Sequence, residues 1–466
     1  MQAFFYFLNP KSTEMKILKF GGTSVGDAQR IRKVAQLLPE AEPCIVVLSA
    51  MAGTTNALVE IANHSSSGNV SMAIEQAKQL EARYMETSHE LFNSPVFRNR
   101  GEKFTNDMYA ELYRKLGCPP TKKVTLEIVA LGEQLSTGLF HLYLTENRIR
   151  STYLPALEFM RIDREREPDY FYISQSLERL IKANSFTRVF ITEGFICRNA
   201  KGQTDNLGRG GSDYTAAIIG NVADSEEVQI WTDIDGLRNN DPRHVVNTKP
   251  IRHLSYGEAA ELAYFGAKIL HPSTIQPCSE KNIPVVLKNT LQPDDPGTLI
   301  DSVYIPKGIK AIAAKKGITA ITIQSSRMLL AYGFLSHVFE VFNRYKTPVD
   351  MIATSEVSIS LTIDDCSNLQ GIANELAEFS TVECTYDQTI VCIVGDFGAN
   401  RKGYAARIFN ALHEIPIRMI SYGGSSNSIS ILVDSQSMTR TLQLLQEVVD
   451  ADVDVNLEQT ANTISY

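Results

Sequence analysis

The chain has 466 residues, of which 44% are hydrophobic and 21% charged, with a formal net charge of −8 at pH 7. This composition is typical of a globular protein of two or three domains, and the acidic balance argues against nucleic acid as its main partner. No apolar run is long enough to span a membrane, and seven dispersed cysteines without a Cys-x-x-Cys pair predict reduced thiols in a cytoplasm rather than a zinc site.

Residues 1–14 differ in character from the rest of the chain. They contain the run Phe4-Phe-Tyr-Phe-Leu8 but lack the basic start and the long apolar core of a signal peptide. Met15 stands directly before the first expected strand. We therefore expect 1–14 to be an extension that precedes the natural start; a native extra edge strand is the alternative.

The first glycine cluster lies in residues 16–25, where a short apolar run ends in Gly21 and Gly22. Glycines allow a sharp turn and bring backbone N–H groups close to an anion. Lys19 adds a positive charge at the end of the same strand. This pattern predicts a phosphate site, although no Gly-Lys-Ser/Thr closes it as in a Walker loop, and a plain tight turn is the alternative.

Strand and helix patterns alternate after this cluster. Apolar runs typical of buried strands recur at residues 44–48, 188–192, 228–232 and 284–288. Helical periodicity occupies most of the chain between them, over residues 26–38, 71–115 and 124–144, with a break at 117–120. This alternation predicts a mainly parallel sheet covered by helices on both faces, with ligands beyond the carboxyl ends of its strands.

The second glycine cluster lies in residues 207–216 and leads directly into a helical pattern. Arg209 offers a planar fork for a carboxylate or phosphate, and Ser212 can donate a hydrogen bond. Asp213 can orient a cation or an ammonium group. A surface turn with incidental charges is the alternative, but two such clusters in one chain favour an anion site.

The C-terminal third has a different organisation. A turn-rich boundary at 291–298 precedes two versions of one unit, over residues 317–364 and 388–434, which repeat at a constant offset. Each unit reads as strand, helix, strand, turn and strand. We expect residues 309–314 to complete the sheet of the second unit from outside the repeat.

Seven motifs, in order, resemble those of the aspartokinases of the amino acid kinase superfamily, and the repeat resembles a tandem of ACT domains. The motifs are residues 19–25, 47–56, 132–137, 207–215, 231–236, 241–243 and 265–272. The resemblance implies an α/β fold, a mainly parallel sheet sandwiched by helices, followed by two α+β ferredoxin-like ACT units. The implied boundaries are 15–300 for the kinase domain, 307–384 for the first ACT region and 385–466 for the second.

The resemblance implies transfer of the γ-phosphoryl group of ATP to the side-chain carboxylate of L-aspartate, which gives 4-phospho-L-aspartate and ADP. This is the first step in the biosynthesis of lysine, threonine, methionine and diaminopimelate. An aspartate carboxylate has a reference pKa near ~3.9, so it is already ionised at neutral pH and requires no general base. The enzyme must instead offset the repulsion between two anions and hold them in line.

Site roles follow from the resemblance, residue by residue. The catalytic residues would be Lys19, Asp213 and Lys268. ATP would be held by Lys19, Gly21, Gly22, Thr232, Asp233, Asp241, Arg243 and Lys268. Aspartate would be held by Ser49, Thr55, Glu133, Arg209, Ser212 and Asp213. Mg2+ would arrive with ATP and would have no protein-only site. Where the family often has an aromatic residue, this chain has Arg238, which we expect to stack on the base instead.

ACT pairs in such enzymes typically bind an end-product amino acid, and this chain resembles the lysine-sensitive branch more than the threonine-sensitive one. The implied effector residues are Met328, Phe334, Leu335, Val349, Asp350, Ser355 and Glu356, with Asp350 and Glu356 at the lysine ammonium. ACT sheets commonly pair across subunits, so the resemblance implies a homodimer, or a tetramer built from it.

Other interpretations belong to different classes. A sister kinase of the superfamily would phosphorylate glutamate, acetylglutamate, carbamate or a nucleotide; residues 132–137 and the ACT pair argue against it. A bifunctional enzyme with a homoserine dehydrogenase would need a longer chain. A catalytically dead amino-acid sensor is disfavoured because Lys19, Arg209 and Asp213 are all present.

Overall fold

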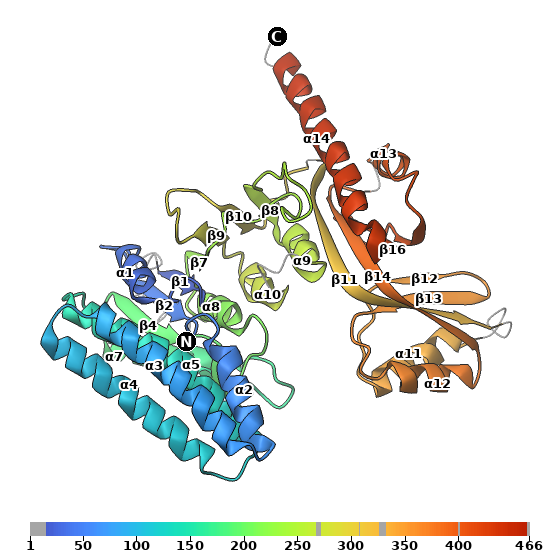
Figure 1. Cartoon of the computed structure of the whole chain (residues 1–466). Coiled ribbons are helices and arrows are strands. Elements are labelled where there is room, and N and C mark those ends of the chain that lie inside the picture. The colour runs from blue at the N-terminus through green and yellow to red at the C-terminus, as the bar shows by residue number, and fades with distance from the viewer. Residues whose placement is uncertain (1–14, 267–271, 307, 326–331, 399–400, 464–466) are drawn as a thin grey trace, which may run out of the picture. The chain divides into compact units, whose positions relative to one another are not determined.

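The structure is a computed structural model that describes residues 15–266, 272–306, 308–325, 332–398 and 401–463 (Figure 1). The chain divides into two compact units. Of the described residues, the first contains 15–237 together with 252–256 and 272–303, and the second contains 238–251, 257–266 and those from 304 onward. Two segments inserted between strands of the first unit therefore belong to the second. None of the described helices is both long and apolar enough to span a membrane.

The first unit is built on an eight-stranded sheet with the strand order β3-β4-β2-β1-β7-β9-β10-β8. The strands are β1 (Lys16–Phe20), β2 (Cys44–Leu48), β3 (Ser151–Tyr153), β4 (Val189–Glu193), β7 (Glu227–Thr232), β8 (His253–Ser255), β9 (Val285–Asn289) and β10 (Thr298–Asp301). All neighbours from β3 to β9 are parallel, whereas β10 is antiparallel to β9. The mainly parallel sheet is confirmed.

Helices cover both faces of this sheet (Figure 1). They are α1 (Ala28–Gln36), α2 (Thr54–Ser66), α3 (Val70–Leu91), α4 (Pro95–Leu116), α5 (Lys122–Glu146), α6 (Ala156–Phe159), α7 (Tyr170–Ala183), α8 (Gly211–Val222) and α10 (Pro272–Glu280). Leu18 and Phe20 of β1 belong to one core with apolar residues of α1 to α5. Ile17 points to the opposite face, where a Cβ on Gly220 of α8 would lie 3.9 Å from it.

The helical stretch predicted over 71–115 is two helices, α3 and α4, and the predicted break at 117–120 marks only the end of the second. Ser94 ends the link between them because its side chain accepts a hydrogen bond from the Phe97 N–H at 3.2 Å. Pro95 follows in the first turn of α4. A serine cap followed by proline is typical of a helix start. These two residue types therefore indicated a new helix, but the apolar periodicity continued across them and predicted one helix.

The second unit contains a six-stranded sheet of order β12-β13-β11-β14-β16-β15. Its strands are β11 (Ile309–Gln324), β12 (Ile352–Thr354), β13 (Ser358–Ile363), β14 (Thr381–Gly395), β15 (Ile417–Ser421) and β16 (Ser428–Asp434). Its helices include α9 (Tyr256–Tyr264), which belongs to this unit from Gly257 onward. The others are α11 (Phe334–Arg344), α12 (Leu369–Ala377), α13 (Tyr404–Ala411) and α14 (Met438–Thr463).

Two long strands, β11 and β14, run through both repeats of this sheet. The second half of β11 pairs with β13 and with the start of β14, whereas its first half pairs with the end of β14. Residues 309–314 therefore complete the second repeat, as predicted, because they pair with residues 391–395. Each repeat has its own apolar core, and the two ferredoxin-like α+β units are confirmed.

Candidate active site

Lys19 and Asp213 form an ion pair in the first unit. The period-2 alternation of β1 places Lys19 on the same face as Ile17, which is the face that α8 covers. Asp213 lies in the first turn of α8, and its carboxylate is 2.5 Å from the Lys19 ammonium. Both side chains are nearly buried, at 10% and 13% exposure. The sheet and the helix thus bring together two residues that are far apart in the sequence.

In the first glycine turn, Gly21 and Gly22 are constrained by different contacts. The Gly21 N–H donates to the Trp231 carbonyl at 3.1 Å, so that amide is already engaged. A Cβ on Gly21 would lie 3.6 Å from the Lys19 ammonium, an ordinary contact. A Cβ on Gly22 would lie only 2.6 Å from the Ala50 carbonyl. Within the described part of the chain, the amides of Gly22 and Thr23 have no hydrogen-bond partner, and they are the ones free for an anion.

Gly22→Ala is expected to destabilise the protein by about 1–3 kcal/mol, since rigid backbone at Ala50 must move to admit a methyl group. Gly21→Ala is the matched control, because its methyl group would meet only contacts of 3.6 Å. Thermal unfolding of both variants checks this. Equal melting temperatures for the two would contradict the close approach of Gly22 to Ala50.

The second glycine turn leads into α8. Gly208 and Gly210 have φ angles of 75° and 70°, a left-handed conformation that favours glycine. The turn exposes Arg209, and no described residue forms an ion pair with it. Ser212 is buried and packs against Gly194, where a Cβ would lie 2.5 Å from the Ser212 Cβ. The helix N-terminus and the free guanidinium make this end of α8 electropositive.

Glu133 lies on α5 and faces the loop that follows β2. Its carboxylate accepts a long hydrogen bond, 3.4 Å, from the Ala50 N–H, and its second oxygen is buried without a partner in the described part of the chain. Burial raises the pKa of Glu133 to about 8. The nearby Ser136 hydroxyl donates to the Ser49 carbonyl at 2.8 Å. Glu133 is a buried acid with one free oxygen, so an ammonium group would satisfy it.

Glu193 is a buried acid that the sequence analysis missed. It ends β4, accepts hydrogen bonds from the Tyr153 hydroxyl and from the Ala156 N–H at 2.8 Å, and is 1% exposed. Burial raises the pKa of Glu193, and its charge raises that of Glu133, so the two carboxyls are neighbours. A glutamate at the end of a buried strand, after three apolar residues and Thr192, was the signal available in the sequence.

The remaining predicted substrate residues are distributed over both units. Thr55 is half-buried in the first turn of α2, and Thr232 ends β7 beside β1, with its hydroxyl 3.2 Å from the Asp233 carboxylate. Asp241 and Arg243 pair with each other at 2.6 Å and belong to the second unit. Arg243 holds the pKa of Asp241 below its usual value.

Two further predicted residues have a different outcome. The Arg238 guanidinium donates to the hydroxyl and to the carbonyl of Thr248, each at 2.8 Å, so it is engaged within the second unit. Lys268, predicted to reach a phosphate, lies outside the described residues.

The predicted effector residues that the structure describes lie in the first repeat of the second unit. Phe334 and Leu335 open α11 after Gly333, and the ring of Phe334 packs on Phe379 with centroids 5.7 Å apart. Val349 packs against the same core. Met328 lies outside the described residues.

Three other effector residues lie near β12 and β13. The Ser355 hydroxyl accepts a hydrogen bond from the Ser358 N–H at 3.1 Å, and Glu356 is exposed. Asp350 points inward, with a side chain only 1% exposed and 2.9 Å from the Lys315 ammonium. The structure therefore gives Asp350 an internal cation, which the sequence analysis did not anticipate.

Comparisons with known proteins agree along most of the chain. Residues 14–289 match the model of the amino acid kinase family, and residues 391–449 match that of the ACT domain. The lysine-sensitive aspartokinase 3 of Escherichia coli is 34% identical over 448 residues, which cover 93% of this chain and 98% of that protein. The chloroplastic aspartokinase 3 of Arabidopsis thaliana is 34% identical over 462 residues, 92% of this chain and 80% of that protein.

Solved structures give the same result. The fold is similar to E. coli aspartokinase III in complex with aspartate and ADP, with a TM-score of 0.81 and 33% identity over 93% of this chain and 99% of that chain. The same enzyme in complex with lysine and aspartate gives a TM-score of 0.74 and 34% identity over the same shares.

Proposed function

Because this chain belongs to the aspartokinases, in which an amino acid kinase domain is joined to ACT domains, we propose that Lys19, Asp213 and Glu133 carry phosphoryl transfer from ATP to L-aspartate. A carboxylate oxygen of aspartate attacks the γ-phosphorus, the bond to the β–γ bridging oxygen breaks, and ADP leaves. No proton is removed from the nucleophile. The protein's task is to neutralise and align two anions.

The observation that carries this proposal is the buried Lys19–Asp213 pair between two glycine turns. Lys19 stabilises the negative charge that shifts between the phosphate oxygens in the transition state, and Asp213 holds the Lys19 ammonium in place. The Gly22 and Thr23 amides donate to phosphate oxygens, while Gly21 leaves room beside the Lys19 ammonium. Lys268 adds a second cation at the β- or γ-phosphate.

The aspartate substrate is recognised by a different set of residues. Glu133 binds the substrate ammonium, with Glu193 next to it. Arg209 binds a substrate carboxylate through its exposed guanidinium. Ser49, Thr55 and Ser212 supply hydroxyl groups around the same ligand. In this division Glu133 of α5 and Glu193 of β4 face the substrate ammonium, and Arg209, directly before α8, faces a substrate carboxylate.

The nucleotide is held by Thr232 and Asp233 at the end of β7, together with Asp241 and Arg243. Mg2+ carried with ATP would screen its phosphates and would need no cage of protein ligands. We assign the kinase domain to residues 15–300 and the ACT regions to 307–384 and 385–466.

Feedback inhibition by L-lysine acts through the ACT regions, with Asp350 and Glu356 at the effector ammonium. Phe334 and Leu335 contribute N–H groups at the start of α11, where a carboxylate is favoured. The active form is a homodimer paired through its ACT sheets. Inhibition is then a coupling between two sites rather than competition at one.

The test is ATP-dependent acyl-phosphate formation from L-aspartate, trapped with hydroxylamine, with and without L-lysine or L-threonine. We expect aspartyl hydroxamate that depends on ATP and falls when lysine is added. Inhibition by threonine alone would reassign the effector. Product from glutamate but not from aspartate would move the chain to a sister activity, and no product from any acid would favour a sensor without catalysis.

A further inference from the structure

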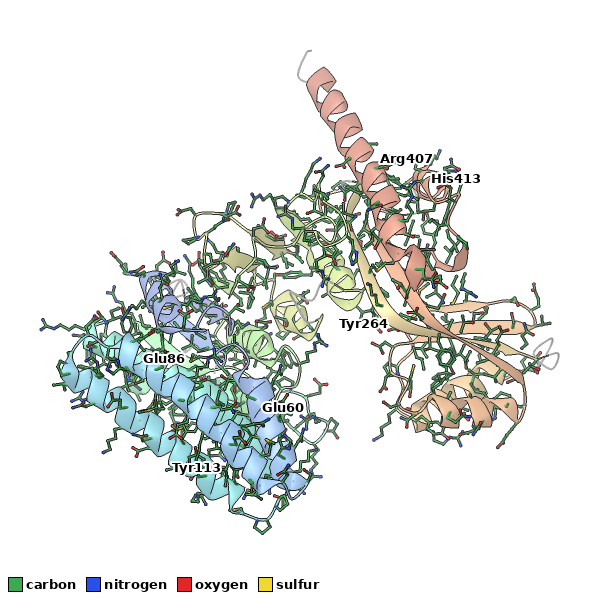
Figure 2. All side chains as sticks on the ribbon, in the orientation of Figure 1. Glu60, Glu86, Tyr113, Tyr264, Arg407 and His413 are labelled. Atoms are coloured by element: carbon green, nitrogen blue, oxygen red, sulfur yellow. The ribbon has the colours of Figure 1, made fainter. Side chains whose placement is uncertain are left out.

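The end of α9 is fixed on the ACT sheet. Phe265 is buried, and Gly266 has a φ of 131°, so close to β11 that a Cβ would lie 2.2 Å from the Ala314 carbonyl. Tyr264 precedes them, and its ring packs edge-on against Phe265 with centroids 5.0 Å apart. Figure 2 shows Tyr264 at this end of α9, beside β11. All of these residues belong to the second unit, although Phe265 and Gly266 open a predicted kinase motif, residues 265–272.

The Tyr264 hydroxyl contacts a predicted effector residue directly. It donates a hydrogen bond of 2.6 Å to Oδ1 of Asp350. The Lys315 ammonium lies 2.9 Å from the same oxygen and 4.5 Å from the centre of the Tyr264 ring. Oδ2 of Asp350 is buried and has no hydrogen-bond partner in the described part of the chain. One carboxylate therefore links the end of α9 to β11 and keeps one acceptor unused.

A hollow adjoins this buried carboxylate. The hollow has a volume of ≈ 160 Å³ and is lined by Glu261 of α9, by Phe265 directly after that helix, by Asp350, and by serines of β15 and β16 that include Ser428 and Ser430. Two of its lining residues are acids and none is a cation. The lining therefore favours a positive group near Asp350.

Lys315 and Tyr264, the two donors to Asp350, differ in whether each has a second partner. Lys315 has a second carboxylate partner, Asp364, at 2.8 Å, and it lies on β11, within the ACT sheet itself. Tyr264 lies on α9, and Asp350 is the partner that its hydroxyl has in the described part of the chain. A change at Asp350 leaves Lys315 paired but releases the hydroxyl of Tyr264.

We propose that Tyr264 is a positioning residue that transmits occupancy of Asp350 by an amino-acid ammonium to the end of α9, where Phe265 and Gly266 open a predicted kinase motif. The inference rests on the proposed function, in which Asp350 is an effector residue. An arriving ammonium is a charged donor, which a carboxylate binds more strongly than a neutral hydroxyl, and by binding Oδ2 it draws the carboxylate away from Tyr264 toward the hollow. The Tyr264 hydrogen bond then breaks, and the end of α9 loses its tie to Asp350. The effector thus acts through a contact that exists only in one of two states.

The test compares Tyr264→Phe with Tyr256→Phe in the full-length enzyme. The first substitution removes the hydroxyl but keeps the ring between Phe265 and Lys315. The control lies on the same helix and removes a hydrogen bond of equal length, 2.6 Å, from Tyr256 to the Ile283 carbonyl. Hydroxamate formation is measured against L-lysine concentration, each rate is divided by that variant's own uninhibited rate, and lysine binding is measured by calorimetry.

We expect Tyr264→Phe to bind lysine but to retain at least fivefold more relative activity at saturating lysine than the parent, while Tyr256→Phe follows the parent. A merely structural loss would lower the uninhibited rate without changing this ratio. Residual activity equal to that of the parent would overturn the inference alone. A parent that forms no aspartyl hydroxamate, or that ignores lysine, would overturn the proposed function and this inference with it.

Discussion

Lys19→Met is expected to lower the rate of acyl-phosphate formation at saturating substrates by about 10³-fold, equivalent to ~4 kcal/mol of transition-state stabilisation. The reason is that the reaction has no general base whose loss could be bypassed, and charge neutralisation is its main requirement. In the first unit, the Lys19 ammonium lies 2.5 Å from the Asp213 carboxylate. Steady-state hydroxamate formation checks the rate. A variant that keeps more than a tenth of the parent rate would remove Lys19 from catalysis.

The matched control is Lys16→Met on the same strand. Lys16 also has an acidic partner, Glu42, at 2.7 Å, but the pair is more exposed and lies at the other end of β1. Its loss should change stability little and turnover less than twofold. Lys19→Met leaves Asp213 without its cation, at a cost of about 1–2 kcal/mol, because the first turn of α8 still stabilises a negative charge. Circular dichroism at the assay temperature separates lost folding from lost catalysis.

Glu133→Gln is expected to raise the KM for aspartate by about 100-fold with a smaller change in kcat, since a charged hydrogen bond to the substrate ammonium is lost. The pH dependence is the sharper readout. Burial raises the pKa of Glu133 to about 8, so the carboxyl is mostly neutral at pH 7 and must lose its proton to bind an ammonium. The parent KM should therefore fall by about tenfold between pH 7 and pH 8.5, and the variant KM should not.

Stability gives an independent sign for the same group. Because its pKa is higher in the folded chain than the ordinary value of 4.5, Glu133 favours the folded state least above its folded pKa. The free energy of unfolding of the parent should fall as the pH rises from 4.5 to 8. Relative to the parent, that of Glu133→Gln should rise by about 2–4 kcal/mol over this range.

The control for Glu133 lies on the same helix. Glu127 pairs with Lys115 at 2.6 Å, so Glu127→Gln removes an acid from α5 away from the substrate site. Its KM should follow the parent at every pH. A pH-dependent KM that persists in Glu133→Gln would assign the titration to another group, with Glu193 the first to examine.

Several features of the site were predictable from local pattern. Lys19 at the end of a buried run and Asp213 after three glycines could be placed at strand and helix ends because those positions follow from periodicity and turn chemistry. Their ion pair could not, since it depends on which strand α8 covers. Glu193 was missed for a related reason: a glutamate that ends a strand is usually solvated, and only the packing of Tyr153 and Ala156 shows that this one is buried.

By itself, the sequence determined the family, the parallel sheet, the repeated ACT unit and the strand at 309–314, because glycine turns, apolar periodicity and repetition are local properties of a chain. Only the tertiary structure decided that residues 257–266 pack into the second compact unit, that Asp350 already has an internal cation, and that Tyr264 contacts it. The Tyr264 contact joins residues that are far apart in the sequence, and no local pattern encodes which of them meet.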